Sequence, residues 1–165
     1  MWQLKNNKLQ VATSLKKRGW KGGVHCCLCG KVETTNHVFF ECSISRFAWC
    51  CLRDALGWTG CPIDHNDLMG VSGNHGSMLT NHLKIFVFAG IAWAIWRSRN
   101  KMAIEQCFPS NPLNVFRSGA AFVQKWRPLL GGADQVVIAS LGEKLMTWLH
   151  NFSPSSATVS DIVEL

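Results

Sequence analysis

Three cysteines and one histidine near the start of the chain constrain its fold more than any other feature. They follow the pattern C-x2-C-x7-H-x4-C, which places them at Cys26, Cys29, His37 and Cys42. Three sulfurs and one imidazole are the ligand set of a closed tetrahedral zinc site, which stabilises a fold but leaves no open position for a substrate. The pattern therefore predicts one structural Zn2+ ion and gives no support to a catalytic one.

Two neighbouring residues compete for the first position, because His25 and Cys27 flank Cys26 and either could replace one ligand. Only Cys26 with Cys29 gives the usual spacing of two residues. Gly30 follows the second cysteine, where a knuckle needs a residue that tolerates positive φ. The alternative is that these residues merely pack, since free cysteine is a common core residue. The spacing favours the metal.

The second half of the pattern cannot lie on one regular helix. His37 and Cys42 are five residues apart, which is about 140° around an α-helix at about 100° per residue. One unbroken helix cannot direct both side chains at a single ion. We expect the backbone to bend between them, with Cys42 near the start of the next helix.

Further motifs surround the four ligands. They are the leader LQVATSLKKRGW at 9–20, the core CCLCGKVETTNHVFFEC at 26–42, the segment SISRFAW at 43–49, and IAWAIWRSRN at 91–100. With these motifs, residues 2–49 resemble the reverse-transcriptase zinc-binding domain of plant LINE-type (non-LTR) retrotransposon polyproteins. The resemblance is fair through Asn100 and weak afterwards. It implies the same four zinc ligands. Because the polymerase of that family lies upstream of this domain, it also implies a detached, non-catalytic C-terminal fragment.

The rest of the chain predicts a mainly α fold, in which a small zinc-knuckle module is followed by a helical bundle with a long buried central helix. The central helix is predicted over about 82–106 from the apolar run IFVFAGIAWAIW at 85–96, with Asn81 as its cap and Phe108-Pro109 as its end. As a helix this run spans about 18 Å, too short for the ~30 Å of a bilayer. We therefore expect it to be buried, including Trp93.

Other helices are predicted from a Ser43 or Ser45 start to Gly57, from Pro112 to Trp126, and over 134–150. No strand is convincing, and at most a short hairpin forms at the knuckle. The predicted organisation follows from these elements: a zinc-binding module at 1–58, an irregular linker at 59–80, a helical region at 81–150 and a mobile tail at 151–165.

The net charge of +7 is concentrated in the zinc segment. Residues 1–53 contain nine Lys and Arg against two acids, Glu33 and Glu41, whereas residues 54–165 contain eight of each. Basic charge beside a zinc knuckle is typical of a nucleic-acid surface. Trp20 could stack on an unpaired base or be buried against the zinc loop. The candidate residues for binding single-stranded RNA or DNA are Lys16, Lys17, Arg18, Trp20, Lys21 and Lys31.

Catalytic motifs are absent from the sequence. It has no adjacent aspartate pair, no Gly-rich phosphate loop, no G-x-S-x-G and no H-E-x-x-H. The start, MWQLKNNKLQ, lacks the apolar core of a signal peptide, so we expect an intracellular protein, with the nucleus as one candidate location, that is neither secreted nor membrane-bound. Its thiols are then reduced, and Cys50, Cys51, Cys61 and Cys107 are packing residues.

Two functions from different classes fit these observations. The first is a zinc-dependent, non-catalytic nucleic-acid-binding module without a small-molecule substrate. The second is a zinc-stapled helical scaffold or protein-interaction remnant that binds no nucleic acid. The position of the basic residues distinguishes them: one shared exposed face favours the first, whereas scattering, or pairing with Glu33 and Glu41, favours the second. The oligomeric state is not predicted by the sequence.

Overall fold

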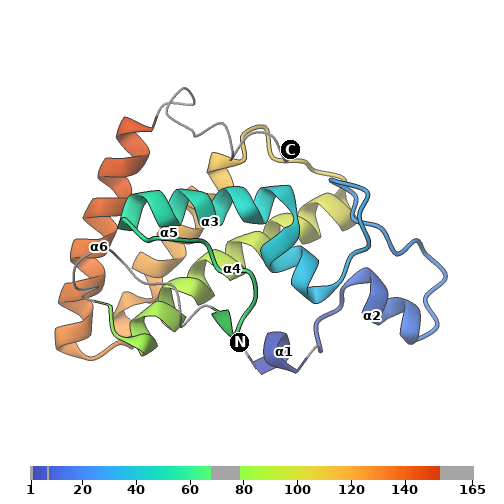
Figure 1. The fold of residues 1–165 in the computed structure, drawn as a ribbon, viewed down its shortest axis with the longest axis horizontal. Coiled ribbons are helices and arrows are strands. Elements are labelled where there is room, and N and C mark those ends of the chain that lie inside the picture. Colours follow the sequence, from blue (N-terminus) through green and yellow to red (C-terminus); the bar gives the residue numbers. More distant parts are fainter. Residues whose placement is uncertain (1, 7, 68–78, 153–165) are drawn as a thin grey trace.

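The long apolar run forms the central helix of the fold. In the computed structural model, which describes residues 2–6, 8–67 and 79–152, helix α4 (Asn81–Glu105) crosses the molecule from one end to the other (Figure 1). It packs against α5 (Leu113–Trp126), against α3 (Ser43–Leu56) and against a short π-helical turn, η1 (His37–Glu41). The predicted helical bundle with a buried central helix is confirmed.

The remaining elements are short or peripheral. Two small helices, α1 (Trp2–Lys5) and α2 (Ala12–Lys17), precede the zinc segment. After α5, a 3-10 turn η3 (Arg127–Leu129) leads into α6 (Gly132–Asn151), which packs against α5 and α3. The described residues contain no strand, and His25 and Val32 form an isolated antiparallel bridge. The mainly α class is therefore confirmed.

Two glycines bring α4 and α5 into close contact. A Cβ atom at Gly119 would lie 3.0 Å from the Cα atom of Ile91, and one at Gly90 would lie 3.3 Å from the Gly119 carbonyl oxygen. Because real Cβ atoms seldom approach other atoms so closely, both positions need a residue without a side chain. The two backbones can then approach closely, and Val123 fits over Gly90.

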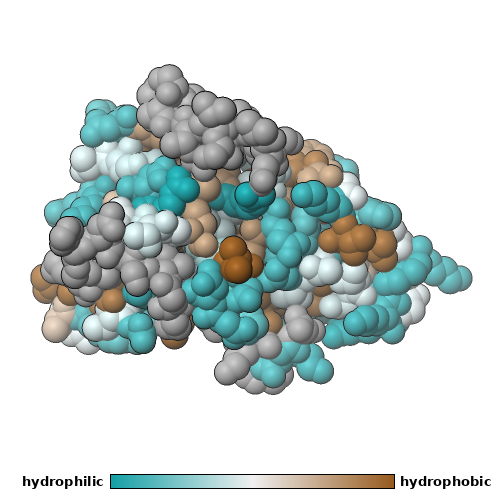
Figure 2. All heavy atoms as spheres, viewed as in Figure 1, coloured by the Kyte–Doolittle hydropathy of each residue, from teal (hydrophilic) through white to brown (hydrophobic). Residues whose placement is uncertain are grey.

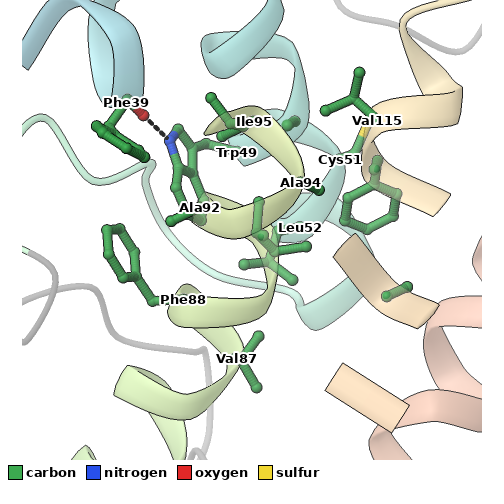
Figure 3. Close-up of a cluster of buried hydrophobic side chains, with 14 of the residues drawn as sticks. Phe39, Trp49, Cys51, Leu52, Val87, Phe88, Ala92, Ala94, Ile95 and Val115 are labelled. Atoms are coloured by element: carbon green, nitrogen blue, oxygen red, sulfur yellow. Dashed lines mark hydrogen bonds between the residues drawn. The ribbon is translucent and has the colours of Figure 1, made fainter. Parts of the chain in front are cut away.

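The core is built around Trp49, which is 1% exposed. Its ring stacks on Phe88 with centroids 5.1 Å apart, and its Nε1 donates a hydrogen bond to the Phe39 carbonyl oxygen at 2.6 Å (Figure 3). One cluster of buried residues runs from Leu4 in α1 to Leu149 in α6. The predicted domain boundaries at 58 and 81 stay a prediction, and residues from both sides of them share this core.

The burial of Trp93 was predicted wrongly. Its side chain is 47% exposed and touches Phe122 edge-on, with centroids 6.4 Å apart. The reason is that α4 is covered by neighbours on most of its circumference but not all of it. Ile85, two turns earlier on the same face, is also exposed at 39%.

The ends of α4 also differ from the prediction. Thr80, not Asn81, is the residue that precedes the helix, and the amide of Lys84 donates to its carbonyl oxygen at 2.9 Å. The helix ends at Gln106, whose φ of 54° is left-handed, before Phe108-Pro109 is reached. The predicted stop of α3 at Gly57 is confirmed by its φ of 63°.

Parts of two predicted segments fall outside the described residues. These are positions 68–78 of the predicted linker and positions 153–165 of the predicted tail. Within the described part of the chain, no helix combines the length and the apolar character that crossing a bilayer requires.

Candidate metal centre and basic surface

The first two thiols are positioned by a tight turn. The amide of Gly30 donates to the Cys26 carbonyl oxygen at 3.0 Å, and the amide of Cys26 donates to that of Lys31 at 2.8 Å. Gly30 has a φ of 73°, which an L side chain rarely adopts. The turn is the predicted knuckle, and the bridge between His25 and Val32 closes its base.

The other two ligands are positioned by η1. The amide of Cys42 donates to the His37 carbonyl oxygen at 2.8 Å, a hydrogen bond between residues five apart. A turn of this width returns Cys42 to the side of the backbone that carries His37. Cys42 then adopts an extended conformation and precedes α3. The predicted bend between the two ligands is therefore present.

The four side chains converge on one point. Their ligand atoms all lie within 4.8 Å of one another. The Sγ atoms of Cys26 and Cys42 are 3.9 Å apart, and Cys29 Sγ is 3.3 Å from His37 Nε2. A tetrahedral zinc ion with bonds of about 2.3 Å to sulfur and about 2.0 Å to nitrogen requires separations of about 3.8 Å between two sulfurs and about 3.5 Å between sulfur and nitrogen. The donor set and its geometry fit one zinc ion.

The two competing residues do not join this group. His25 and Cys27 are both exposed, whereas Cys26, His37 and Cys42 are buried and Cys29 is half-buried. Their side chains lie outside the cluster that the four converging ligands form. The spacing of two residues therefore selects the correct cysteine pair.

The two most buried ligand thiols, those of Cys26 and Cys42, share a hydrogen bond. It lowers the pKa of Cys26, and the same bond, together with burial, raises the pKa of Cys42. Zinc binds thiolates, so an ion at this site would take both sulfurs in their deprotonated form.

A buried ion pair ties the metal centre to the helical region. Glu33, 2% exposed, accepts hydrogen bonds from Arg99 Nη2 at 2.5 Å and Nε at 3.1 Å, and its Oε1 also accepts from the Ala12 amide at 2.8 Å. Arg99 lies over the ring of Trp96, 5.4 Å from its centroid. Sequence reasoning missed this pair. Glu33 and Arg99 each lie in one of the quoted motifs, but they are 66 positions apart and neither motif indicates the other as a partner.

The predicted nucleic-acid residues lie at one end of the molecule. This end is formed by α2 and the knuckle (Figure 1), and hydrophilic side chains predominate there in the space-filling view (Figure 2). Trp20 is 47% exposed, and its ring rests against Gly22. Five cationic side chains are exposed and form no ion pair with a described residue: Lys16, Lys17, Arg18, Lys21 and Lys31.

The two acids of this segment do not neutralise these cations. Glu33 is paired with Arg99. Glu41 accepts a hydrogen bond from Asn36 Nδ2 at 2.6 Å, and its other oxygen lies 3.9 Å from His37 Nδ1, on the side of the ring away from the thiols. The basic end therefore keeps its positive charge.

Comparison with known proteins identifies the N-terminal segment. Residues 1–49 match the family model described as zinc-binding in reverse transcriptase. The match includes all four converging ligands and ends within α3. It confirms that this segment is a reverse-transcriptase zinc-binding domain, which is not the catalytic part of that enzyme. No curated protein and no solved structure matches the chain.

Proposed function

We propose that the zinc-loaded N-terminal segment binds single-stranded RNA or DNA with little sequence preference, and that the chain is not an enzyme. The observation that carries this proposal is the set of exposed, unneutralised cations at one end of the molecule. The proposal includes an origin in a plant LINE-type polyprotein, as the resemblance of the motifs implies. It also includes action inside the cell, in the nucleus.

The role of zinc in this proposal is indirect. A closed site offers no coordination position to a ligand, but it fixes the turn that carries Lys21 and Lys31 on either side of the thiols. The ion thus holds the exposed cations of this turn in place. Electrostatic binding of this kind releases counterions from the phosphates and is strongly dependent on salt.

The test is a titration of full-length, zinc-loaded protein into a labelled 12-residue oligouridylate, read by fluorescence anisotropy at several salt concentrations. The slope of log affinity against log salt should be about −0.7 per phosphate neutralised. Replacing Lys16, Lys17 and Arg18 with Ala should flatten that slope by about 1.4 to 2.1, the equivalent of two to three contacts. Zinc content should not change, because none of the three is a ligand.

A matched control removes the same charge elsewhere. Lys125, Arg127 and Lys144 lie after the zinc segment, on α5, η3 and α6, and their replacement with Ala should leave the slope close to that of the parent. Equal affinity of parent and Lys16/Lys17/Arg18 variant at every salt concentration would exclude the basic end as the site. No binding by the parent at low salt would favour the scaffold function instead.

A further inference from the structure

A second basic surface lies in a cleft between the C-terminal half of α4 and the start of α5. The cleft has a volume of about 460 Å3. Two cations and several hydrogen-bonding side chains line it, and no carboxylate does. Its polar residues are Arg97, Ser98, Lys101, Ser110, Asn114 and Ser118.

The two cations are not used within the described part of the fold. Arg97 and Lys101 are exposed and form no ion pair with a described residue. They lie one turn apart on α4, and like charges at this spacing destabilise a helix. Arg99, between them in sequence, points to the opposite side and is neutralised by Glu33. Within the described residues, Glu33 therefore neutralises Arg99, whereas Arg97 and Lys101 line a cleft that contains no carboxylate.

The lining suits a phosphate group. A guanidinium matches the geometry of phosphate oxygens and binds them with charge-assisted hydrogen bonds. The hydroxyl groups of Ser98 and Ser110 and the side-chain amide of Asn114 supply neutral donors to the same space. A ligand without oxygen acceptors would leave these donors unused.

An aromatic platform precedes the cations on the same helix. Trp93 is one turn before Arg97, so Trp93, Arg97 and Lys101 follow one another along a single face at intervals of about 6 Å. Its half-exposed ring is held edge-on by Phe122, which also lines the cleft. Trp93 itself lines a second hollow, of about 330 Å3, rather than the cleft. Bases of single strands stack on exposed rings of this kind.

We infer that this cleft binds a phosphate of single-stranded nucleic acid and that Trp93 stacks on an adjacent unpaired base. The class of ligand rests on the proposed function, but the residues are separate from the basic end. A strand that runs along α4 meets one aromatic ring and then two cations. The combination of stacking surface and backbone-binding cations is the one that single-strand binding uses.

Two variants of the zinc-loaded, full-length protein test the inference with the same 12-residue oligouridylate. The double replacement Arg97→Gln with Lys101→Gln should weaken binding about tenfold at low salt and flatten the salt slope by about 1.4. Trp93→Ala should weaken it about fivefold or more, and Trp93→Phe should restore part of the loss. The matched control, Lys125→Gln with Lys144→Gln, should bind like the parent. Thermal unfolding identifies any variant that has lost its fold.

The outcomes separate this inference from the proposed function. If the Lys16/Lys17/Arg18 variant loses affinity and the Arg97/Lys101 variant does not, the cleft is not a site and the proposed function stands. If the reverse is found, the cleft is the site and the basic end is not. Uridine monophosphate is added as a competitor at equal phosphate concentration. If uridine monophosphate competes as strongly as the unlabelled oligonucleotide, the ligand of the cleft is a free nucleotide and the inference of a bound strand is wrong.

Discussion

The N-terminal segment and the helical region of this chain obtain their structure in different ways. Before η1, the elements are four to six residues long, and much of the knuckle is exposed. From α3 onwards the main helices are 14 to 25 residues long and bury aromatic and aliphatic side chains in a common core. The first region adds metal ligands and hydrogen bonds to a few core residues such as Leu4 and Val11, whereas the second depends mainly on apolar burial.

The difference has a consequence for the surface. A segment that folds around a metal ion needs few apolar residues, so most of its side chains remain available for contacts with other molecules. In the helical region most apolar side chains are required for the core, and the exposed exceptions, such as Trp93, are informative. Both surfaces proposed as binding sites, the basic end and the cleft between α4 and α5, are lined by exposed side chains that do not contribute to the core.

The largest effect is expected from the zinc ligands. Elemental analysis should give about one zinc per chain for the parent and far less for Cys29→Ser and His37→Ala, because each variant lacks one of the four ligands. Since binding of a structural zinc ion contributes about 10–16 kcal/mol to the folding of small zinc domains, the knuckle should unfold in both variants. Protection from hydrogen exchange should then be lost at the amides of Cys26 and Gly30, which are hydrogen-bonded in the folded knuckle, and retained in α4 and α5.

His25→Ala and Cys27→Ser are the controls for this experiment, since both side chains are exposed and outside the cluster. Both should keep full zinc content. Full occupancy in Cys29→Ser and in His37→Ala would rule out the proposed ligand set and, with it, the contrast between the two regions.

Within the helical region, two tryptophans should differ sharply. Trp49→Ala removes a fully buried ring and should lower the free energy of unfolding by about 3–5 kcal/mol. Trp93→Ala removes a half-exposed ring with one edge contact and should cost about 1 kcal/mol. Urea unfolding of the zinc-loaded variants measures both. Equal losses of unfolding free energy would mean that the half-exposed side of α4, which carries Trp93, contributes as much to the core as the side that faces Trp49 of α3.

The connection between the two regions is tested at Arg99. Arg99→Gln leaves the buried Glu33 carboxylate without its cation and should cost about 3 kcal/mol, at the lower end for broken buried pairs because Arg99 is 12% exposed. Arg97→Gln, two residues earlier, should change stability by less than about 0.5 kcal/mol. A small effect at Arg99 in urea unfolding would show that the two regions are joined by apolar contacts alone.

The smallest effect concerns the contact of α4 with α5. Gly119→Ala forces a Cβ atom against Ile91 and should destabilise the chain by about 1–3 kcal/mol. Gly132→Ala, at the first position of α6 where a Cβ atom meets nothing within 4 Å, should change the free energy of unfolding by at most a few tenths of a kcal/mol. Thermal unfolding of both variants provides the comparison, and similar midpoints would argue against close packing at Gly119.

Local signals predicted the parts of the structure that are set by neighbouring residues. The x2 spacing and Gly30 identified the knuckle, the five-residue separation of His37 and Cys42 required a bend, and Gly57 marked the end of α3. Each of these is decided within one or two turns of chain. The prediction for Trp93 was wrong for the opposite reason: an apolar run has no periodicity that tells which of its sides the neighbours leave uncovered.

The sequence by itself determined the zinc ligands, the helical class and the concentration of charge in the first third of the chain, because these depend on residue type and spacing alone. Only the tertiary structure decided that Glu33 is paired with Arg99, that the acids do not neutralise the basic end, and that Arg97 and Lys101 face a cleft without carboxylates. These features join residues far apart in the chain. Their formation depends on how α4 packs against the knuckle and α5, which no local pattern records.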